Sequence, residues 1–145
     1  MKIEPMKLED LDQVMIIEQA SFKQPWERSF FKYDLKRPGG HLFVAKDNDE
    51  ILGYIDTWQI TDEMHLANIA VTSNSRHKGI ASQLLSKLIE IAKENHCQDI
   101  FLEVRASNEI AQKFYEKFGF VKSYKREKYY PDGEDAIIYR KRLVD

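Results

Sequence analysis

Apolar residues recur along the chain with two different periods, and each period predicts a different kind of element. After a short extended start at residues 2–5, an apolar residue appears every three or four positions, which is helical spacing. One helix is expected from Leu8, and a second from Pro25 to the stop at Pro38-Gly39-Gly40. The apolar positions that predict them are Leu8, Leu11, Val14, Met15 and Ile17 in the first, and Trp26, Phe30, Phe31 and Leu35 in the second.

The middle of the chain changes to extended runs. Residues 41–46 and 51–60 indicate two strands around the polar turn at 47–50, and residues 64–71 indicate a third strand after another polar break. Three consecutive strands joined by short polar turns predict an antiparallel meander.

The remaining third mixes both patterns. A helix is expected from Ile80, a strand at 100–104, a helix over 108–118 that ends at Gly119, and strands at 120–130 and 136–143. Residues 1–145 are therefore expected to form one α+β domain in αβα layers, with a mixed, mostly antiparallel sheet of about six to seven strands flanked by about four helices. The inward positions of the two helices are Ile80, Leu84, Leu85, Leu88, Ile91 and Ala92, and Ile110, Ala111, Phe114, Tyr115 and Phe118.

Composition narrows the class of protein. Of 145 residues, 43% are apolar and 32% are charged, which is a globular balance. The apolar runs are too short to cross a bilayer and the start has no leader pattern, so neither a membrane nor a secreted location is expected. The net charge of -2 argues against nucleic acid as a partner, and the single cysteine, Cys97, is typical of a reducing cytoplasm.

The polar loop before residue 80 is the first candidate site. Arg76-His77-Lys78-Gly79-Ile80-Ala81 follows a strand and opens a helix, so free backbone N–H groups and the positive end of the helix dipole converge there. A phosphate or pyrophosphate would fit, although an ordinary strand-to-helix turn would have the same composition. The Gly-Lys-Ser/Thr ending of a P-loop is absent, and the flanking hairpins exclude a Rossmann unit.

Glu103 is the second candidate, because every neighbour in the strand Ile100–Val104 is apolar. A carboxylate desolvated in a central strand has a raised pKa and can act as a general base near neutral pH. An ion pair with Arg105, or a solvated position at the strand end, is the alternative that would give Glu103 no catalytic role.

Tyr115 is the third candidate, with Asn108 seven residues before it. A tyrosine hydroxyl can protonate a leaving thiolate, although an aromatic residue in an apolar stripe is more often part of the core. Asn108 is at a place where asparagine is most often the helix N-cap.

No metal site is expected. The histidines are scattered without the spacing of metal ligands, and the lone cysteine lacks the partners of a catalytic nucleophile. The histidines are His41, His65, His77 and His96.

Several segments together carry a family resemblance. The strand 68–71, the loop 76–81, Leu102-Glu103-Val104-Arg105, Ser107-Asn108 and the segment 114–120 follow one another along the chain. In this order they resemble the GNAT acetyltransferase superfamily, over nearly the whole chain. Pro25-Trp26, residues 102–108, Tyr129-Tyr130 and residues 134–138 resemble more narrowly the ribosomal-protein-alanine N-acetyltransferases of the RimI type.

The resemblance implies the GNAT fold, acetyl-coenzyme A as co-substrate without a metal, and roles for the matching residues. Glu103 would take a proton from the incoming ammonium, and Tyr115 would protonate the departing thiolate. The residues implied to bind acetyl-coenzyme A are Ile69, Ala70 and Val71 along the pantetheine arm, Arg76 through Ser82 at the pyrophosphate, and Asn108.

The same resemblance implies the acceptor, an N-terminal α-amine of a peptide or protein and in particular the alanine of a ribosomal protein. An α-amine has a pKa of about 7.7–8.0 against about 10.4 for lysine, so a modest carboxylate base suffices more easily for a chain terminus. The residues expected to line the acceptor site are Trp26, Glu63, Tyr129 and Tyr130.

The chain departs from the family pattern at two places. Ala81 stands where many members carry a second glycine, and Glu27-Arg28-Ser29 follows Trp26 where related chains usually have serine directly. Two alternatives stay open: acetylation of small amines or protein lysines, and a non-catalytic module that binds acyl-coenzyme A. The joint presence of Glu103 and Tyr115 argues against the second.

Overall fold

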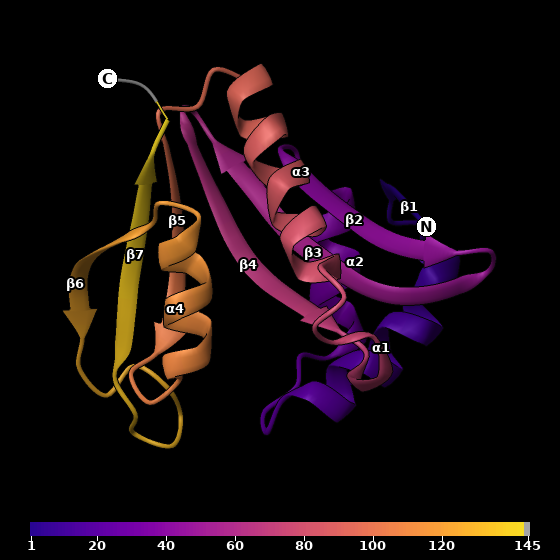
Figure 1. The fold of residues 1–145 in the computed structure, drawn as a ribbon, viewed down its shortest axis with the longest axis horizontal. Coiled ribbons are helices and arrows are strands. Elements are labelled where there is room, and N and C mark those ends of the chain that lie inside the picture. The colour runs from indigo at the N-terminus through magenta and orange to yellow at the C-terminus, as the bar shows by residue number, and fades with distance from the viewer. Residues whose placement is uncertain (144–145) are drawn as a thin grey trace.

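The structure, a computed structural model, describes residues 1–143, and its strands form a single seven-stranded mixed sheet (Figure 1). The strand order is β1-β2-β3-β4-β5-β7-β6, and every neighbouring pair is antiparallel except β4 and β5, which are parallel. This confirms the predicted fold class. The strands are β1 (Lys2–Pro5), β2 (Gly40–Asp47), β3 (Glu50–Ile60), β4 (Glu63–Val71), β5 (Asp99–Arg105), β6 (Val121–Arg126) and β7 (Ala136–Arg142).

Two α-helices cover each face of this sheet (Figure 1). Helices α3 (Ile80–Glu94) and α4 (Glu109–Lys117) lie on one face, and α1 (Leu11–Ser21) and α2 (Arg28–Lys36) lie on the other. We call these the α3–α4 face and the α1–α2 face. Each face has its own apolar core, and because side chains alternate along a strand, β2, β3 and β4 contribute to both. Single 3-10 turns precede α1 (Leu8–Asp10) and α3 (Ser73–Ser75).

The parallel pair β4 and β5 separates partway along its length. Pairing runs from Glu63–Asp99 to Leu66–Leu102 and then stops, so the two strands diverge toward their C-terminal ends (Figure 1). At the same level β4 has a bulge, because Leu66 and Asn68 pair with consecutive residues of β3. The extra residue reverses the direction of the side chains beyond it. Before the bulge, even-numbered residues of β4 face α3; after it, Ile69 and Val71 do.

The helix starts differ from the predictions. Leu8 is 55% exposed in the 3-10 turn, and α1 begins only at Leu11. Helix α2 begins at Arg28 rather than near Pro25, because the backbone of Glu27 is extended (φ −80°, ψ 156°). In the loop before the helix, the Trp26 N–H is bonded to the Glu18 carboxylate. Phe30 is 53% exposed while Phe31 is fully buried, since a helix directs adjacent residues to different sides.

Two predictions for the last third of the chain are also wrong. Ile110 was expected to face inward but is 84% exposed, because the buried side of α4 is centred on Tyr115. The strand predicted at 120–130 ends at Arg126, since Lys128 has a left-handed backbone (φ +51°) and donates its N–H to the Asp135 carboxylate. Tyr129 and Tyr130 therefore lie in the β6–β7 loop (residues 127–135), not in a strand. No helix within residues 1–143 is both long and apolar enough to span a membrane.

Candidate functional site

The start of α3 presents uncapped backbone N–H groups. Gly79 is the N-cap with φ +79°, and no side chain caps the helix. The first turn, Ile80 to Ser82, therefore keeps donors free, while the Gly79 carbonyl accepts the Gln83 N–H at 3.0 Å. His77 is also left-handed (φ +66°) and is exposed with its neighbours Arg76 and Lys78. The donors, the helix dipole and the open space around Gly79 fit a pyrophosphate.

The second element of the site is the free edge of β4. Beyond the Leu66–Leu102 pair, residues 68–71 hydrogen-bond to β3 on one side and have no strand on the other. Ile69 and Val71 point to the α3–α4 face, and Ala70 points to the α1–α2 face, where it is 9% exposed. A strand edge of this kind offers N–H and C=O groups to an extended ligand, and the pantetheine arm is one.

Glu103 is exposed, so the predicted desolvation of this carboxylate is wrong. The reason is the splay: beyond Leu102, β5 no longer has β4 beside it, and the Glu103 side chain points to the α1–α2 face in the space that opens. The alternative ion pair with Arg105 is not formed either. Arg105 instead lies 2.9 Å from both Asp132 and Glu134.

Tyr115 lies on the opposite face of the sheet. It is 7% exposed in α4, within the α3–α4 core, where Phe114 and Phe120 pack edge-on against its ring. No hydrogen bond to its hydroxyl is present within residues 1–143. Burial raises the pKa of this phenol, and so, to a smaller extent, does nearby Tyr130. Tyr115 therefore keeps its proton at neutral pH and is available as a proton donor.

Asn108 is the N-cap of α4, as its position predicted. Its Oδ1 accepts the Ala111 N–H at 3.1 Å, and the side chain is exposed close to the end of β5. This cap orients the helix that carries Tyr115.

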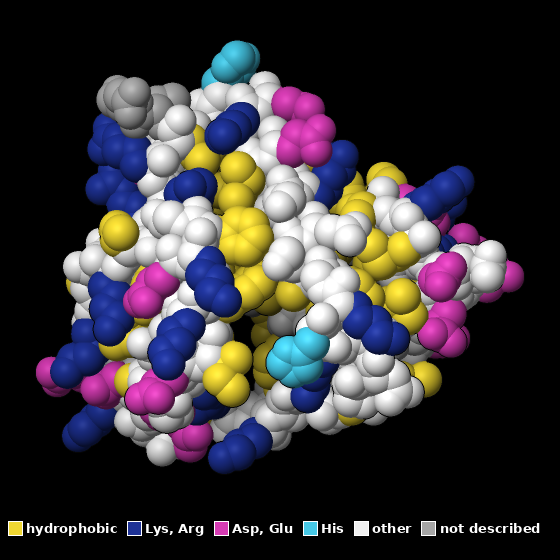
Figure 2. Space-filling model, viewed as in Figure 1, with side chains coloured by type: hydrophobic (Ala, Val, Ile, Leu, Met, Phe, Trp, Pro, Cys, Tyr) yellow, Lys and Arg dark blue, Asp and Glu magenta, His cyan; other side chains and the backbone are white. Residues whose placement is uncertain are grey.

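Tyr130 interacts electrostatically with both candidate groups. Burial raises its pKa to about 12 and the charge of Glu103 contributes, while Tyr130 in turn helps to raise the pKa of Tyr115. Figure 2 shows the surface hollowed between the half that carries α4 and the half that carries α3. The splay thus has a carboxylate on one face and a protonated phenol on the other.

Of the predicted acceptor residues, Trp26, Tyr129 and Tyr130 lie on the side of Glu103. Tyr129 and Tyr130 pack edge-to-face at 5.2 Å, and burial followed by the Glu103 carboxylate raises the pKa of Tyr129. Trp26 packs against Phe31 at 5.2 Å in the loop between α1 and α2. Glu63 is not brought to this group: it starts β4 at the paired end and lies 3.4 Å from His65.

Arg105 and Glu134 form an ion pair beside the candidate site, and the sequence analysis did not predict that pair. Ser107 donates its N–H to Glu134 at 2.8 Å, and this bond together with Arg105 lowers the pKa of Glu134 to about 2. Arg105 also stacks over the Tyr130 ring at 4.1 Å and donates to Gln24 at 3.2 Å. The sequence places Arg105 directly after the Glu103-Val104 dipeptide, which draws attention to the arginine, but it does not indicate which carboxylates Arg105 pairs with.

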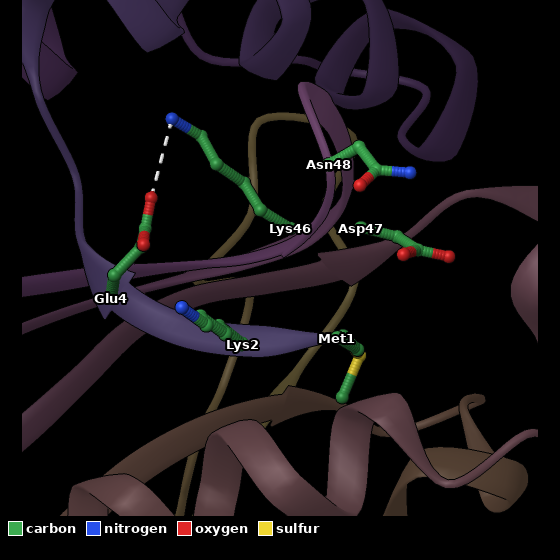
Figure 3. Close-up of a pocket in the computed structure, with 6 residues that line it drawn as sticks. All are labelled: Met1, Lys2, Glu4, Lys46, Asp47 and Asn48. Atoms are coloured by element: carbon green, nitrogen blue, oxygen red, sulfur yellow. Dashed lines mark ion pairs between the residues drawn. The ribbon is translucent and has the colours of Figure 1, made fainter.

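Two recesses lie outside the splay, and one of them, between β1 and α3, includes Ser82 of the first turn of α3. The other, of about 310 Å³, is at the β1–β2 edge, where Lys46 approaches Glu4 at 3.4 Å (Figure 3). None of the predicted site residues is among the six that line it. Among residues 1–143, no group of His, Cys, Asp or Glu has the arrangement of a metal site.

Known proteins are similar to this chain in sequence and fold. Residues 11–120 match the acetyltransferase (GNAT) family. A Bacillus subtilis relative, provisionally named a ribosomal protein bS18-alanine N-acetyltransferase, is 37% identical over 135 residues, covering 92% of this chain and 89% of its own. An N-alpha-acetyltransferase of Saccharolobus solfataricus is 33% identical over 150 residues, covering 94% and 90%. The crystal structure of the Escherichia coli ribosomal-protein-S18-alanine N-acetyltransferase superposes with a TM-score of 0.92 at 32% identity, covering 99% and 94%. The chain belongs to the GNAT acetyltransferase family.

Proposed function

We propose that this protein transfers the acetyl group of acetyl-coenzyme A to an N-terminal α-amine, with the N-terminal alanine of a ribosomal protein as its acceptor. The names of the relatives support this acceptor. The observation that carries the chemistry is the splay between β4 and β5, with Glu103 on one face and the protonated Tyr115 on the other. We further propose a cytoplasmic location, which the free, buried Cys97 supports.

The proposed binding of acetyl-coenzyme A uses backbone groups. The N–H groups of the first turn of α3, Ile80 to Ser82, hold the pyrophosphate, with the loop from Arg76 around it. The free edge of β4 at Ile69 to Val71 pairs with the pantetheine arm, and one of its N–H groups polarises the thioester carbonyl. Asn108 contacts the same co-substrate from the start of α4.

The proposed reaction is a direct transfer. Glu103 takes a proton from the acceptor ammonium, directly or through water, and the free amine nitrogen attacks the thioester carbonyl carbon. The C–S bond breaks as the amide forms, and Tyr115 gives its proton to the departing thiolate. The second proton that the amine nitrogen loses on becoming an amide passes to water, from which Tyr115 regains its own, so the net release is the one proton taken up by Glu103. The amine enters on the α1–α2 face and the thiolate leaves on the α3–α4 face, so the two proton transfers do not compete for the same space.

The acceptor end of the proposed site favours a chain terminus. Trp26, Tyr129 and Tyr130 border the approach to Glu103 with rings, which suit an extended backbone. A carboxylate base is better matched to an α-amine than to lysine, because an α-amine with a pKa of about 7.7–8.0 loses its proton more readily than a lysine with a pKa of about 10.4. Glu63 lies at the paired end of β4, away from Glu103, so its charge would only help to attract a cationic segment of the acceptor toward the site.

Mass spectrometry of acetyl-coenzyme A incubations tests the proposal with two peptides. One begins with a free alanine; the other has the same sequence, a blocked N-terminus and an internal lysine. We expect acetylation of the first peptide alone. Modification of the lysine peptide would contradict the acceptor class. Modification of neither, with acetyl-coenzyme A bound, would replace the proposal by a small-amine acceptor or a non-catalytic binding module.

A further inference from the structure

Glu18 is a buried carboxylate that the proposed reaction does not use. It lies in the last turn of α1, is 1% exposed, and forms no ion pair with any described lysine or arginine. Burying a charge without a cation is costly, and it persists only where several donors compensate it.

Three donors from three parts of the chain meet at this carboxylate. Oε2 accepts the backbone N–H of Trp26 at 2.9 Å. Oε1 accepts the Tyr54 hydroxyl at 2.5 Å and the Asn68 side-chain amide at 2.8 Å. Hydrogen bonds to an ionised acceptor are strong and directional, so the three donors are held in a fixed arrangement.

Two of these donors belong to opposite sides of the proposed reaction. Trp26 lies in the loop at residues 22–27, which borders the acceptor approach. Asn68 directly follows the β4 bulge and precedes Ile69, at the start of the free edge proposed for the pantetheine arm. In the described part of the chain, Glu18 is the only side chain that hydrogen-bonds both this loop and β4.

We propose that Glu18 is a positioning residue that fixes the distance between the bound amine and the bound thioester. It does so by linking the loop at 22–27 to β4 through one carboxylate, while Tyr54 only anchors that carboxylate to the sheet. The inference rests on the proposed function, because it assigns the loop to the acceptor and β4 to acetyl-coenzyme A. Glu18 touches neither substrate.

Glu18→Gln is the primary test, because glutamine has almost the same shape. Its amide nitrogen is a donor facing donors, so at least one of the three bonds is lost. We expect kcat/KM for a free-alanine peptide to fall by about tenfold to a hundredfold, since small misplacements of reacting groups have effects of that size. The Kd of acetyl-coenzyme A, measured by calorimetry, should stay within about twofold, because the pyrophosphate donors of α3 are untouched.

Tyr54→Phe is the matched control. It removes one donor to the same carboxylate but keeps both links, so it should lower the melting temperature while leaving kcat/KM near that of the wild type. Asn68→Ala cuts the link to β4 and should resemble Glu18→Gln in kinetics. It also serves as the test if Glu18→Gln does not fold.

Trp26 fluorescence gives a readout that does not depend on activity. In a Trp58→Phe background, Trp26 is the sole tryptophan, and acrylamide should quench it more readily once Glu18→Gln releases the loop. Unchanged kcat/KM in both Glu18→Gln and Asn68→Ala would overturn the positioning role, as would kinetics of Tyr54→Phe as poor as theirs. A wild-type protein inactive on every N-terminal peptide would instead contradict the proposed function, and the quenching experiment would still show whether Glu18 holds the loop.

Discussion

Gln24 and Arg105, 81 positions apart in the sequence, are joined by a 3.2 Å hydrogen bond from the guanidinium Nη2 to the amide Oε1. The other terminal nitrogen of Arg105 lies 2.9 Å from both Asp132 and Glu134. One guanidinium therefore connects the loop at 22–27, the end of β5 and the β6–β7 loop. Arg105 thus ties together the segments that carry Trp26, Glu103, Tyr129 and Tyr130, the residues of the proposed acceptor side.

Arg105→Met should weaken acceptor binding. Methionine retains part of the apolar stem but leaves Asp132 and Glu134 without their cation. The β6–β7 loop is then held beside β5 only by the Ser107–Glu134 and Ala106–Asp135 hydrogen bonds and shifts more easily. We expect the KM of a free-alanine peptide to rise about tenfold, the size of a lost charge-assisted contact, with the Kd of acetyl-coenzyme A unchanged. Gln24→Ala removes one neutral acceptor and should raise KM less than about threefold. Equal KM values for the three proteins would show that Arg105 does not shape the acceptor site.

The ion pair of Arg105 with Glu134 should survive mild acid. The pKa of Glu134 is lowered to about 2, so its contribution to stability is complete above its ordinary pKa of about 4.3 and is lost only as the pH falls through 2. Nuclear magnetic resonance titration of the Glu134 carboxyl checks this value. Arg105→Met should move that pKa upward toward the ordinary value, although the Ser107 N–H will keep it below.

Glu103→Gln should produce a pH-dependent loss of rate. Below the α-amine pKa of about 7.7–8.0, the acceptor needs a base; above it, the amine is already neutral. We expect kcat/KM to fall about a hundredfold at pH 6, in the range of general-base catalysis, and the deficit to shrink by pH 9. Glu94→Gln, an exposed carboxylate at the end of α3, is the control for altered net charge. A deficit that is constant from pH 6 to pH 9 would rule out proton abstraction by Glu103.

Tyr115→Phe isolates the proposed acid. The change removes a hydroxyl that hydrogen-bonds to no described residue and leaves the ring in the α3–α4 core, so we expect little change in melting temperature. kcat should fall about a hundredfold with the Kd of acetyl-coenzyme A preserved. A thioester with a leaving thiol of low pKa should recover much of the rate, because it needs no proton. Full activity of Tyr115→Phe on acetyl-coenzyme A would exclude the role.

Asp56→Asn should flatten the dependence of stability on pH. Asp56 is fully buried, no described donor reaches its oxygens, and burial with the neighbouring Asp34 carboxyl raises its pKa to about 9. Between about pH 4 and pH 9 the folded state thus binds the extra proton, so stability falls as the pH rises, by up to about 1.4 kcal/mol per unit.

Asparagine is the same size, cannot ionise and offers a donor to Asp34. Urea unfolding at pH 5 and pH 8.5 should therefore show a smaller loss of stability for Asp56→Asn than for the wild type. Asp49→Asn, in the exposed turn between β2 and β3, is the control and should leave the slope unchanged. Parallel curves for the wild type and Asp56→Asn would contradict a protonated Asp56.

Local patterns predicted most of the fold because the spacing of apolar residues depends on which side of each helix or strand is buried. The period of apolar residues identified α3 and the β2–β3–β4 meander, and Asn108 was correctly expected at a helix start. Element ends were less predictable, because distant partners decide them. Glu18, eight residues away, holds the Trp26 N–H in the loop before α2, and Asp135 takes the Lys128 N–H beyond the end of β6.

The site was harder to predict because its geometry depends on where the pairing between β4 and β5 stops. Apolar neighbours suggested that Glu103 was desolvated, but only the loss of pairing beyond Leu66–Leu102 shows that it is exposed. No sequence spacing indicates that Arg105 selects Asp132 and Glu134 rather than Glu103. The bulge of β4, which sends Asn68 toward Glu18, is equally invisible in a regular alternation of apolar residues.

Gly79→Ala tests the proposed pyrophosphate site against a control that the chain itself provides. Gly79 (φ +79°) and Gly133 (φ +89°) are both left-handed, and no atom lies within 4 Å of where a Cβ would stand at either position. Alanine at each should therefore cost a similar 1–2 kcal/mol, about the penalty of that backbone region, through strain alone. Gly79 precedes the free N–H groups of α3, whereas Gly133 is in the β6–β7 loop. We expect Gly79→Ala to raise the Kd of acetyl-coenzyme A about tenfold in calorimetry and Gly133→Ala to leave it unchanged. If both variants lose stability but neither loses affinity, the turn at Gly79 does not shape the binding site, and the pyrophosphate must be held elsewhere.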